Sequence, residues 1–245
     1  MAAMAIELEV CQAGKCTQKG APMLLRDIEE ASVGLACVMP SRCLKKCSKG
    51  PNCRESTEGS VFKGLKKFSR VEAMLNDIIP GFEMSELQRK VSKLKFAARR
   101  AEEAADRMDG INKALSLLGP ESSAARKEPN LLAQLLVMRS QELVETHTDM
   151  AVQDAQKAVH ILPGWAFGQV TLSRALEANG RFGEAMVIMR AAARIGHGVD
   201  RKALNKKLAK LQEKAMRKSA QHGDQRRISN TNAAEEVPDI DIFSQ

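Results

Sequence analysis

Two pairs of cysteines in the first fifty residues are the side chains best suited to chemistry in this 245-residue chain. Cys11 and Cys16 have the spacing C-x4-C. Cys43 and Cys47 have the spacing C-x3-C and follow after 26 intervening residues. Each pair comes from one turn, so folding brings two turns together, a typical pattern for a metal site. Thiolates are soft donors that bind iron and zinc strongly, and the pattern therefore predicts a metal site at these four cysteines.

The other two cysteines, Cys37 and Cys53, match neither pair. They lie in segments predicted to be strands, and we interpret them as small buried apolar residues in preference to ligands or a redox switch.

The start MAAMAIELEV lacks both the apolar region of a secretory signal and the Arg- and Ser-rich arm of an organelle presequence. A disulfide framework is therefore not expected. We expect a cytoplasmic protein, or a plastid or mitochondrial one if a presequence is missing from this sequence.

Composition limits the classes of partner. The net charge of +8 favours acidic partners. With no tyrosine and one tryptophan to stack on bases, nucleic acid is not an expected partner. No stretch approaches the ~20 apolar residues of a membrane span. The four histidines lie in the second half of the chain and no Ser/His/Asp arrangement is visible, so hydrolytic or acyl-transfer chemistry is not predicted; they are His147, His160, His197 and His222.

The elements that must position the cysteines are a mixture of strands and helices over residues 5–80. IELEV alternates as a half-buried strand does, and VGLACVM predicts a second strand. Between them, GAPMLLRDIEEA predicts a helix with one apolar face, formed by Leu24, Leu25 and Ile28. CRES and SVFKGL predict a hairpin. A capping box at Ser69 and Glu72 predicts the start of a closing helix, with Val71, Met74, Leu75 and Ile78 inward, which Pro80 and Gly81 end.

This order of elements, together with both cysteine spacings and the GPN at 50–52, resembles the thioredoxin-like [2Fe-2S] ferredoxins. That family includes iron-sulfur subunits of respiratory complex I and of bacterial hydrogenases. The resemblance covers residues 5–80 and implies a thioredoxin-like α+β domain. It also implies a [2Fe-2S] cluster bound by Cys11, Cys16, Cys43 and Cys47, in an electron-transfer protein or oxidoreductase subunit with no substrate of its own. Many members have glycine within and just after the C-x3-C loop, where this chain has Lys45 and Ser48.

Charged and small residues surround both cysteine pairs. We expect Gly14 and Gly50 to let backbone amides point toward the sulfurs, which helps to set the reduction potential. Five lysines crowd the same two loops: Lys15, Lys19, Lys45, Lys46 and Lys49. They are expected to favour a reduced, more negative cluster and to attract an acidic redox protein.

From Ser85 onward the sequence predicts helices. Ser85 and Gln88 form a second capping box. Apolar and alanine residues then recur at steps of four and three from Leu87 to Met108, which predicts a long helix. It would form either a coiled-coil dimer or a hairpin or linker helix packed within its own chain, and we favour the second. Gly119 and Pro120 end this segment.

The next segment contains a repeat of small residues. Ala151, Ala155 and Ala158 recur as Ala185, Met189 and Ala192, an offset of 34 residues. With Pro163, Leu172 and Gly180, this pattern resembles the tetratricopeptide repeat, although Arg139 and Glu142 replace a small residue and an aromatic. Since such repeats are not stable singly, residues 85–218 are expected to form an all-α helical-repeat domain. The resemblance implies a groove that docks a protein partner.

The last predicted helix covers 200–218 and is strongly basic, with one apolar face formed by Leu204, Leu208, Leu211 and Ala215. We expect it to cap the stack of repeats, in preference to gripping nucleic acid or a membrane. Residues 219–245 are polar, are expected to be disordered, and end in EEVPDIDIFSQ, a short docking motif or a frayed end.

Two functional interpretations follow. The first is a one-electron carrier with a [2Fe-2S] cluster, in which the helical region docks a protein partner. The alternative is a non-redox scaffold or assembly factor that acts through its groove, with a structural zinc or a vestigial site at the same four cysteines. The sequence predicts no oligomeric state for either.

Overall fold

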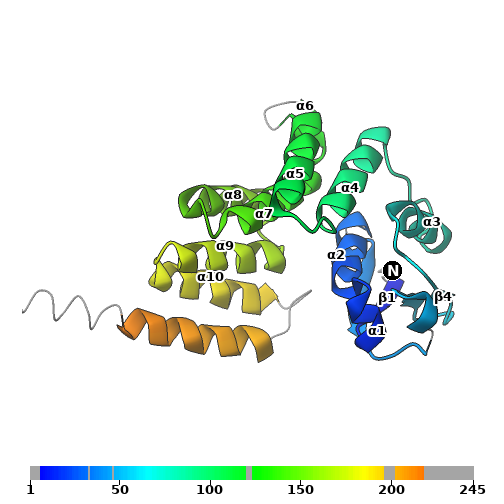
Figure 1. The fold of residues 1–245 in the computed structure, drawn as a ribbon, viewed down its shortest axis with the longest axis horizontal. Coiled ribbons are helices and arrows are strands. Elements are labelled where there is room, and N and C mark those ends of the chain that lie inside the picture. Colours follow the sequence, from blue (N-terminus) through cyan, green and yellow to red (C-terminus); the bar gives the residue numbers. More distant parts are fainter. Residues whose placement is uncertain (1–5, 33, 46, 120–122, 196–201, 218–245) are drawn as a thin grey trace, which may run out of the picture.

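The computed structural model describes residues 6–32, 34–45, 47–119, 123–195 and 202–217 (Figure 1). Over these ranges the protein is a small mixed α/β part followed by a predominantly helical remainder. The predicted tail at 219–245, Lys46, His197 and His222 lie outside the described residues. None of the helices within the described ranges is both long and apolar enough to span a membrane.

Four strands form one sheet with the order β2-β1-β3-β4. They are β1 (Ile6–Cys11), β2 (Ala36–Ser41), β3 (Cys53–Glu55) and β4 (Val61–Phe62). β1 and β2 are parallel and are connected by the helix α2 (Ala21–Ser32), whereas β3 is antiparallel to β1 and to β4. The predicted strands, the helix between the first two and the hairpin are thus confirmed.

One core holds the α/β part together. Leu8 and Val10 alternate with more exposed glutamates along β1 and are fully buried. α2 and α3 (Phe68–Ile78) supply further buried apolar side chains, mainly Leu24, Ile28, Val71, Met74 and Leu75. Leu25 and Ile78, also predicted to face inward, are half-buried at its margin. Removal of this apolar surface from water is the main stabilising term.

Only one of the two predicted capping boxes is formed. At Ser85, the Gln88 N–H donates to Ser85 Oγ at 3.1 Å and the Ser85 N–H donates to Gln88 Oε1 at 2.7 Å. The box predicted at Ser69 is wrong, since α3 begins at Phe68 with no side-chain cap. The Phe68 ring is buried edge-on against Phe96, with centroids 6.0 Å apart. This packing draws residue 68 into the helix and leaves Ser69 inside its first turn.

The single long helix predicted after Ser85 is also wrong. The chain forms α4 (Glu86–Ala98) and α5 (Ala104–Leu118), which pack against each other, so the favoured packing within one chain is confirmed. A Cβ on Gly110 would lie 2.9 Å from the Ala98 Cβ, which shows how closely the two helices approach. The break coincides with Arg99 and Arg100, whose side chains reach across to acidic residues of α2.

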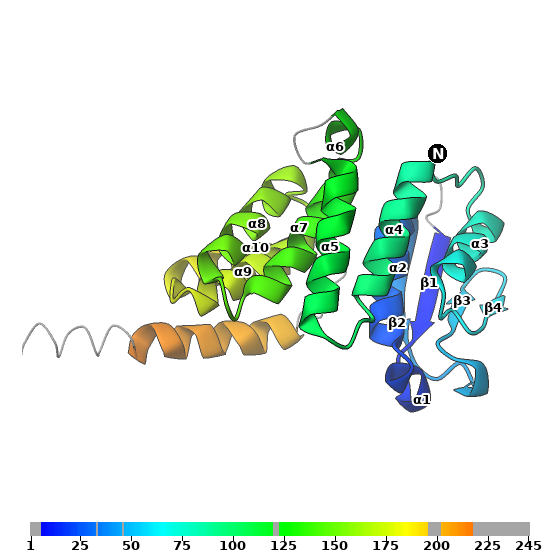
Figure 2. The same cartoon turned by 45° about the horizontal axis from the view of Figure 1, so that its top comes forward.

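The remaining helices form a stack (Figures 1 and 2). They are α6 (Ser123–Lys127), α7 (Pro129–Leu143), α8 (Thr148–Ile161), α9 (Ala166–Ala178) and α10 (Phe182–Ile195). The five alanines and one methionine of the predicted repeat are fully buried: Ala151, Ala155, Ala158, Ala185, Met189 and Ala192. An interhelix hydrogen bond recurs with them: Ser140 Oγ donates to the Ala151 carbonyl at 2.8 Å, and Ser173 Oγ to the Ala185 carbonyl at 2.7 Å.

Residues that depart from the repeat pattern make ion pairs instead. Arg139 contacts Asp154 at 2.6 Å and Glu142 contacts Arg107 at 2.9 Å. The basic segment is helical over 202–217 and packs by its apolar face against the last pair of helices, with Leu204 and Leu211 buried. Glu177 of α9 pairs with two of its lysines, Lys207 and Lys214. The helix therefore lies where a capping helix was expected.

Candidate metal centre

The two cysteine loops meet at one edge of the sheet. Cys11 is the last residue of β1, and Cys16 lies in the short helix α1 (Gly14–Gln18) that follows. Cys43 lies in the loop after β2, and Cys47 begins the 3-10 turn η1 (Cys47–Lys49). Because β1 and β2 are parallel, their carboxyl ends share an edge. The Gln12 N–H, just after β1, donates to the Ser41 carbonyl at the end of β2 at 3.0 Å.

Three of the four predicted ligands are brought together. The side chains of Cys16 and Cys43 lie close enough to the Cys11 thiol to help lower its pKa. Cys11 and Cys16 are buried, whereas Cys43 is exposed, so the group opens to the surface at one side. The side chain of Cys47 is not among those that the structure describes. Within the described side chains, no three or more His, Cys, Asp or Glu adopt the geometry of an ion site.

Backbone amides support the Cys11 thiol. Burial acts to raise its pKa, but backbone hydrogen bonds at Ala13 and Leu44, followed by the two neighbouring thiols, outweigh burial and lower the pKa below its ordinary value. Ala13 follows β1 and Leu44 belongs to the second cysteine loop, so both loops stabilise negative charge on this sulfur. A lowered pKa makes a better metal ligand, because the thiolate is the binding form.

The GPN segment packs directly on Cys16. A Cβ on Gly50 would lie 2.7 Å from Cys16 Sγ, closer than atoms can approach, so this position requires glycine. Asn52 is fully buried, its Nδ2 faces Cys16 Sγ at 4.0 Å, and its Oδ1 accepts from the Gly64 N–H at 3.3 Å. By contrast, nothing lies within 4 Å of a Cβ built on Gly14. Of the two glycines singled out in the sequence, only Gly50 is required by a close approach.

The second cysteine loop contains a residue in the left-handed conformation. Lys45 has φ of +56°, a region where glycine is favoured because it has no Cβ to clash. Its N–H donates to Cys43 Sγ at 3.4 Å. This is the loop in which many members of the resembled family have glycine. The substitution noted in the sequence is therefore accommodated, with a lysine in a glycine-type conformation.

The two remaining cysteines lie in strands, as predicted. Cys53 in β3 is fully buried in the core, and burial, with a smaller contribution from Glu9, raises its pKa to about 12. This thiol is therefore protonated and unreactive near neutral pH. Cys37 in β2 is half-buried and sits opposite Glu7 of β1.

A cationic surface surrounds the cysteine edge. Lys15, Lys19, Lys45 and Lys49 are exposed as expected, and Lys19 Nζ donates to the Ser48 carbonyl at 3.0 Å, which links the two loops. Sequence reasoning missed a third contributor, the segment from β4 into α3, which adds four exposed cations: Lys63, Lys66, Lys67 and Arg70. This segment lies against the GPN, since the Leu65 N–H donates to the Pro51 carbonyl at 3.0 Å. No Asp or Glu occurs in segments 12–26, 42–52 and 60–71. This absence of acidic residues can be read from the sequence, but it indicates a cationic surface only when the three segments are known to lie together.

Comparisons with known proteins found no protein-family model that matches the chain and no match among curated proteins.

Proposed function

We propose that the chain binds a [2Fe-2S] cluster through Cys11, Cys16, Cys43 and Cys47 and acts as a one-electron carrier. The observation that supports this most directly is that Cys11, Cys16 and Cys43 lie at one sheet edge, where Cys16 and Cys43 both help to lower the pKa of the Cys11 thiol. When bound, such a cluster takes up and releases one electron with little rearrangement. The chain's own part is to hold the sulfurs, supply amide hydrogen bonds and present the site to a partner.

The topology of the α/β part supports a thioredoxin-like identity for residues 5–80. A sheet of order β2-β1-β3-β4, with only β3 reversed, a crossover helix after β1 and a closing helix after β4, is the arrangement that the resemblance implies. In the helical part, the buried small residues and the recurring serine hydrogen bond support a tetratricopeptide-type repeat. A protein partner for the helical part remains part of the proposal.

The residues at the sheet edge suit the cluster. Two of the thiols are buried, which limits access of water and oxidants, and the third, Cys43, is exposed at the surface. N–H donors reach both Cys11 and Cys43, and such bonds stabilise the added negative charge of a reduced site. The exposed lysines around them favour an acidic redox protein as the partner, since opposite charge steers the encounter.

The proposal is tested by purifying the full chain without oxygen. We expect a brown protein whose visible absorbance is bleached by dithionite, with iron and acid-labile sulfide in equal amounts. A colourless protein with stoichiometric zinc would overturn the carrier and favour the alternative, a scaffold with a structural metal.

Substitution of single cysteines tests which thiols are ligands. Cys43→Ser is expected to abolish the cluster or change its spectrum strongly, because an exposed ligand is replaced by a poorer donor. Cys53→Ser is the matched control, since Cys53 lies in the core with a pKa of about 12. Iron content and absorbance are measured for both variants, and equal loss of iron in the two would show that the ligand assignment is wrong.

A further inference from the structure

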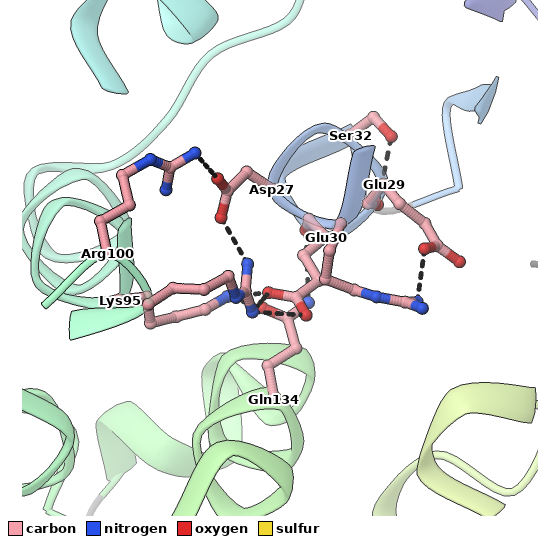
Figure 3. Close-up of polar contacts among 9 residues, drawn as sticks. Asp27, Glu29, Glu30, Ser32, Lys95, Arg100 and Gln134 are labelled. Atoms are coloured by element: carbon pink, nitrogen blue, oxygen red, sulfur yellow. Dashed lines mark hydrogen bonds and ion pairs between the residues drawn. The ribbon is translucent and has the colours of Figure 1, made fainter. Parts of the chain in front are cut away.

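The outer face of α2 carries acidic residues that are buried against the helical part. Asp27 is 6% exposed and Glu30 is 5% exposed. Asp27 points toward Arg100, and Glu30 points toward Lys95 and Gln134 (Figure 3). Carboxylates are almost never buried to this extent unless they are paired.

The partners of these carboxylates come from the last turn of α4 and from the two residues that follow it. Lys95 Nζ lies 2.8 Å from Glu30 Oε2 (Figure 3). Arg99 donates to both Glu30 oxygens at 2.9 Å. Arg99 also pairs with Asp27, and Arg100 contacts Asp27 at 2.6 Å. Lys95 is itself only 4% exposed. The cluster therefore consists of two acids from one part of the chain and three bases from the other.

Two further helices of the stack also contact α2. Gln134 of α7 accepts from Lys95 and donates to the Glu30 carbonyl at 3.3 Å. The Arg26 guanidinium lies over the Phe167 ring of α9, 3.5 Å from its centroid. α4, α7 and α9 are the first helices of the successive pairs α4/α5, α7/α8 and α9/α10. Each of these pairs therefore supplies side chains that contact α2: Lys95 from the first, Gln134 from the second and Phe167 from the third.

Burial and ion pairing act against each other at this contact, and burial prevails at Asp27, whose pKa is raised, and at Lys95, whose pKa is lowered. Burial alone would raise the pKa of Glu30, but Arg99 and Lys95 outweigh burial and lower it to about 2. The carboxylate is therefore charged at neutral pH and needs its cations. Removing one member leaves an uncompensated buried charge. This charge lowers the stability of the protein by far more than the intact pair raises it.

We propose that the side chains of the helical part that contact α2 form a binding surface for an acidic helix, and that its occupant is α2 of the same chain. Lys95, Arg99 and Arg100 are the cations that recognise the occupant, and Phe167 adds an aromatic contact. An external acidic helix reaches this surface only when α2 leaves it. While α2 occupies this surface, the helical part holds the cysteine edge in a fixed orientation, whether or not the four cysteines bind a cluster.

Reagent access to Lys95 in the full chain tests the contact. In the wild type, an amine-acylating reagent should modify exposed Lys90 quickly and Lys95 hardly at all. In the variant Asp27→Lys/Glu30→Lys we expect Lys95 to be modified about 100-fold faster or more, because like charges now face each other. Glu58→Lys/Glu213→Lys is the matched control, with the same change of net charge at exposed positions, and should leave Lys95 protected. The sites are read by mass spectrometry.

A labelled peptide of residues 20–32 then tests the nature of the occupant. It should bind the Asp27→Lys/Glu30→Lys variant and not the wild type, and a peptide with lysine at both acidic positions should bind neither. Equal binding of the native peptide to wild type and variant would overturn the proposal, as would a Lys95 that stays protected in a folded variant. If the double variant does not fold, Glu30→Gln decides: faster labelling of Lys95 supports the proposal and an unchanged rate overturns it.

Discussion

Gly50 is the single residue at which the cysteine site has the least room. A Cβ there would lie 2.7 Å from the Sγ of Cys16, which is itself fully buried. We expect Gly50→Ala to lower the free energy of unfolding by about 1–3 kcal/mol, a typical cost of overpacking, and to reduce iron binding. Urea unfolding and iron analysis measure the two effects. Gly14→Ala is the matched control because its Cβ would meet open space, and equal losses in both variants would contradict the argument.

Local patterns predict which thiols group together better than they predict how the backbone fits around them. The two cysteine spacings predict that Cys11, Cys16, Cys43 and Cys47 lie together, since each pair belongs to one turn. The need for glycine at position 50 and the left-handed conformation of Lys45 depend on how one loop lies on the other. The capping boxes make the same point. Ser85 and Ser69 have equivalent motifs, but the burial of Phe68 overrides the second.

At the scale of elements, the packing of α4 on α5 depends on small side chains. A Cβ on Gly110 would meet the Ala98 Cβ at 2.9 Å, whereas a Cβ on Gly183, also within a helix, would meet nothing within 4 Å. Gly110→Ala should therefore destabilise the protein by about 1–3 kcal/mol as the helices are forced apart. Gly183→Ala should be neutral or stabilising by up to ~1 kcal/mol, the difference in helix propensity. Thermal and urea unfolding compare the two variants, and the same sign of change in both would refute the close packing.

Helices were predicted more reliably than their ends. The steps of four and three from Leu87 to Met108 continue through the break at residues 99–103, which contains Ala101, and through Ala105, which is exposed. Periodicity therefore did not reveal the break. The 34-residue offset was informative because it fixes which small residues meet, and all six are fully buried in the structure.

At the scale of the whole molecule, Glu30 links folding to pH. Its pKa falls from 4.5 to about 2 on folding, so its contribution is complete above about pH 4.5 and is lost as the pH falls through 2. This contribution is worth about 3 kcal/mol. Glu30→Gln removes it, and the difference in unfolding free energy between wild type and variant should shrink by about that amount from pH 6 to pH 2. Urea titrations at several pH values measure it, with exposed Glu58→Gln as the control. A difference that does not change with pH would show that Glu30 is not held by Arg99 and Lys95.

The contact between the two parts of the chain was not predictable from local patterns. Asp27 and Glu30 resemble the solvated face of an amphipathic helix, and Lys95, Arg99 and Arg100 resemble the solvated face of another. Glu30 and Arg99 are 69 positions apart. Only the three-dimensional arrangement reveals that the two faces cover each other.

The position of α2 has a consequence for how the sequence is free to vary. One side of this helix is fixed by the sheet through Leu24 and Ile28, and the other is fixed by the stack through Asp27 and Glu30. A surface helix normally has an unconstrained side on which substitutions accumulate. Only a small part of the surface of α2 is unconstrained in this way. Among natural variants of this chain, changes in α2 should therefore be rarer than in α10, whose Val187 is 62% exposed. Where an acidic residue of α2 does change, a compensating change in the last turn of α4 or in the two residues that follow it should accompany it.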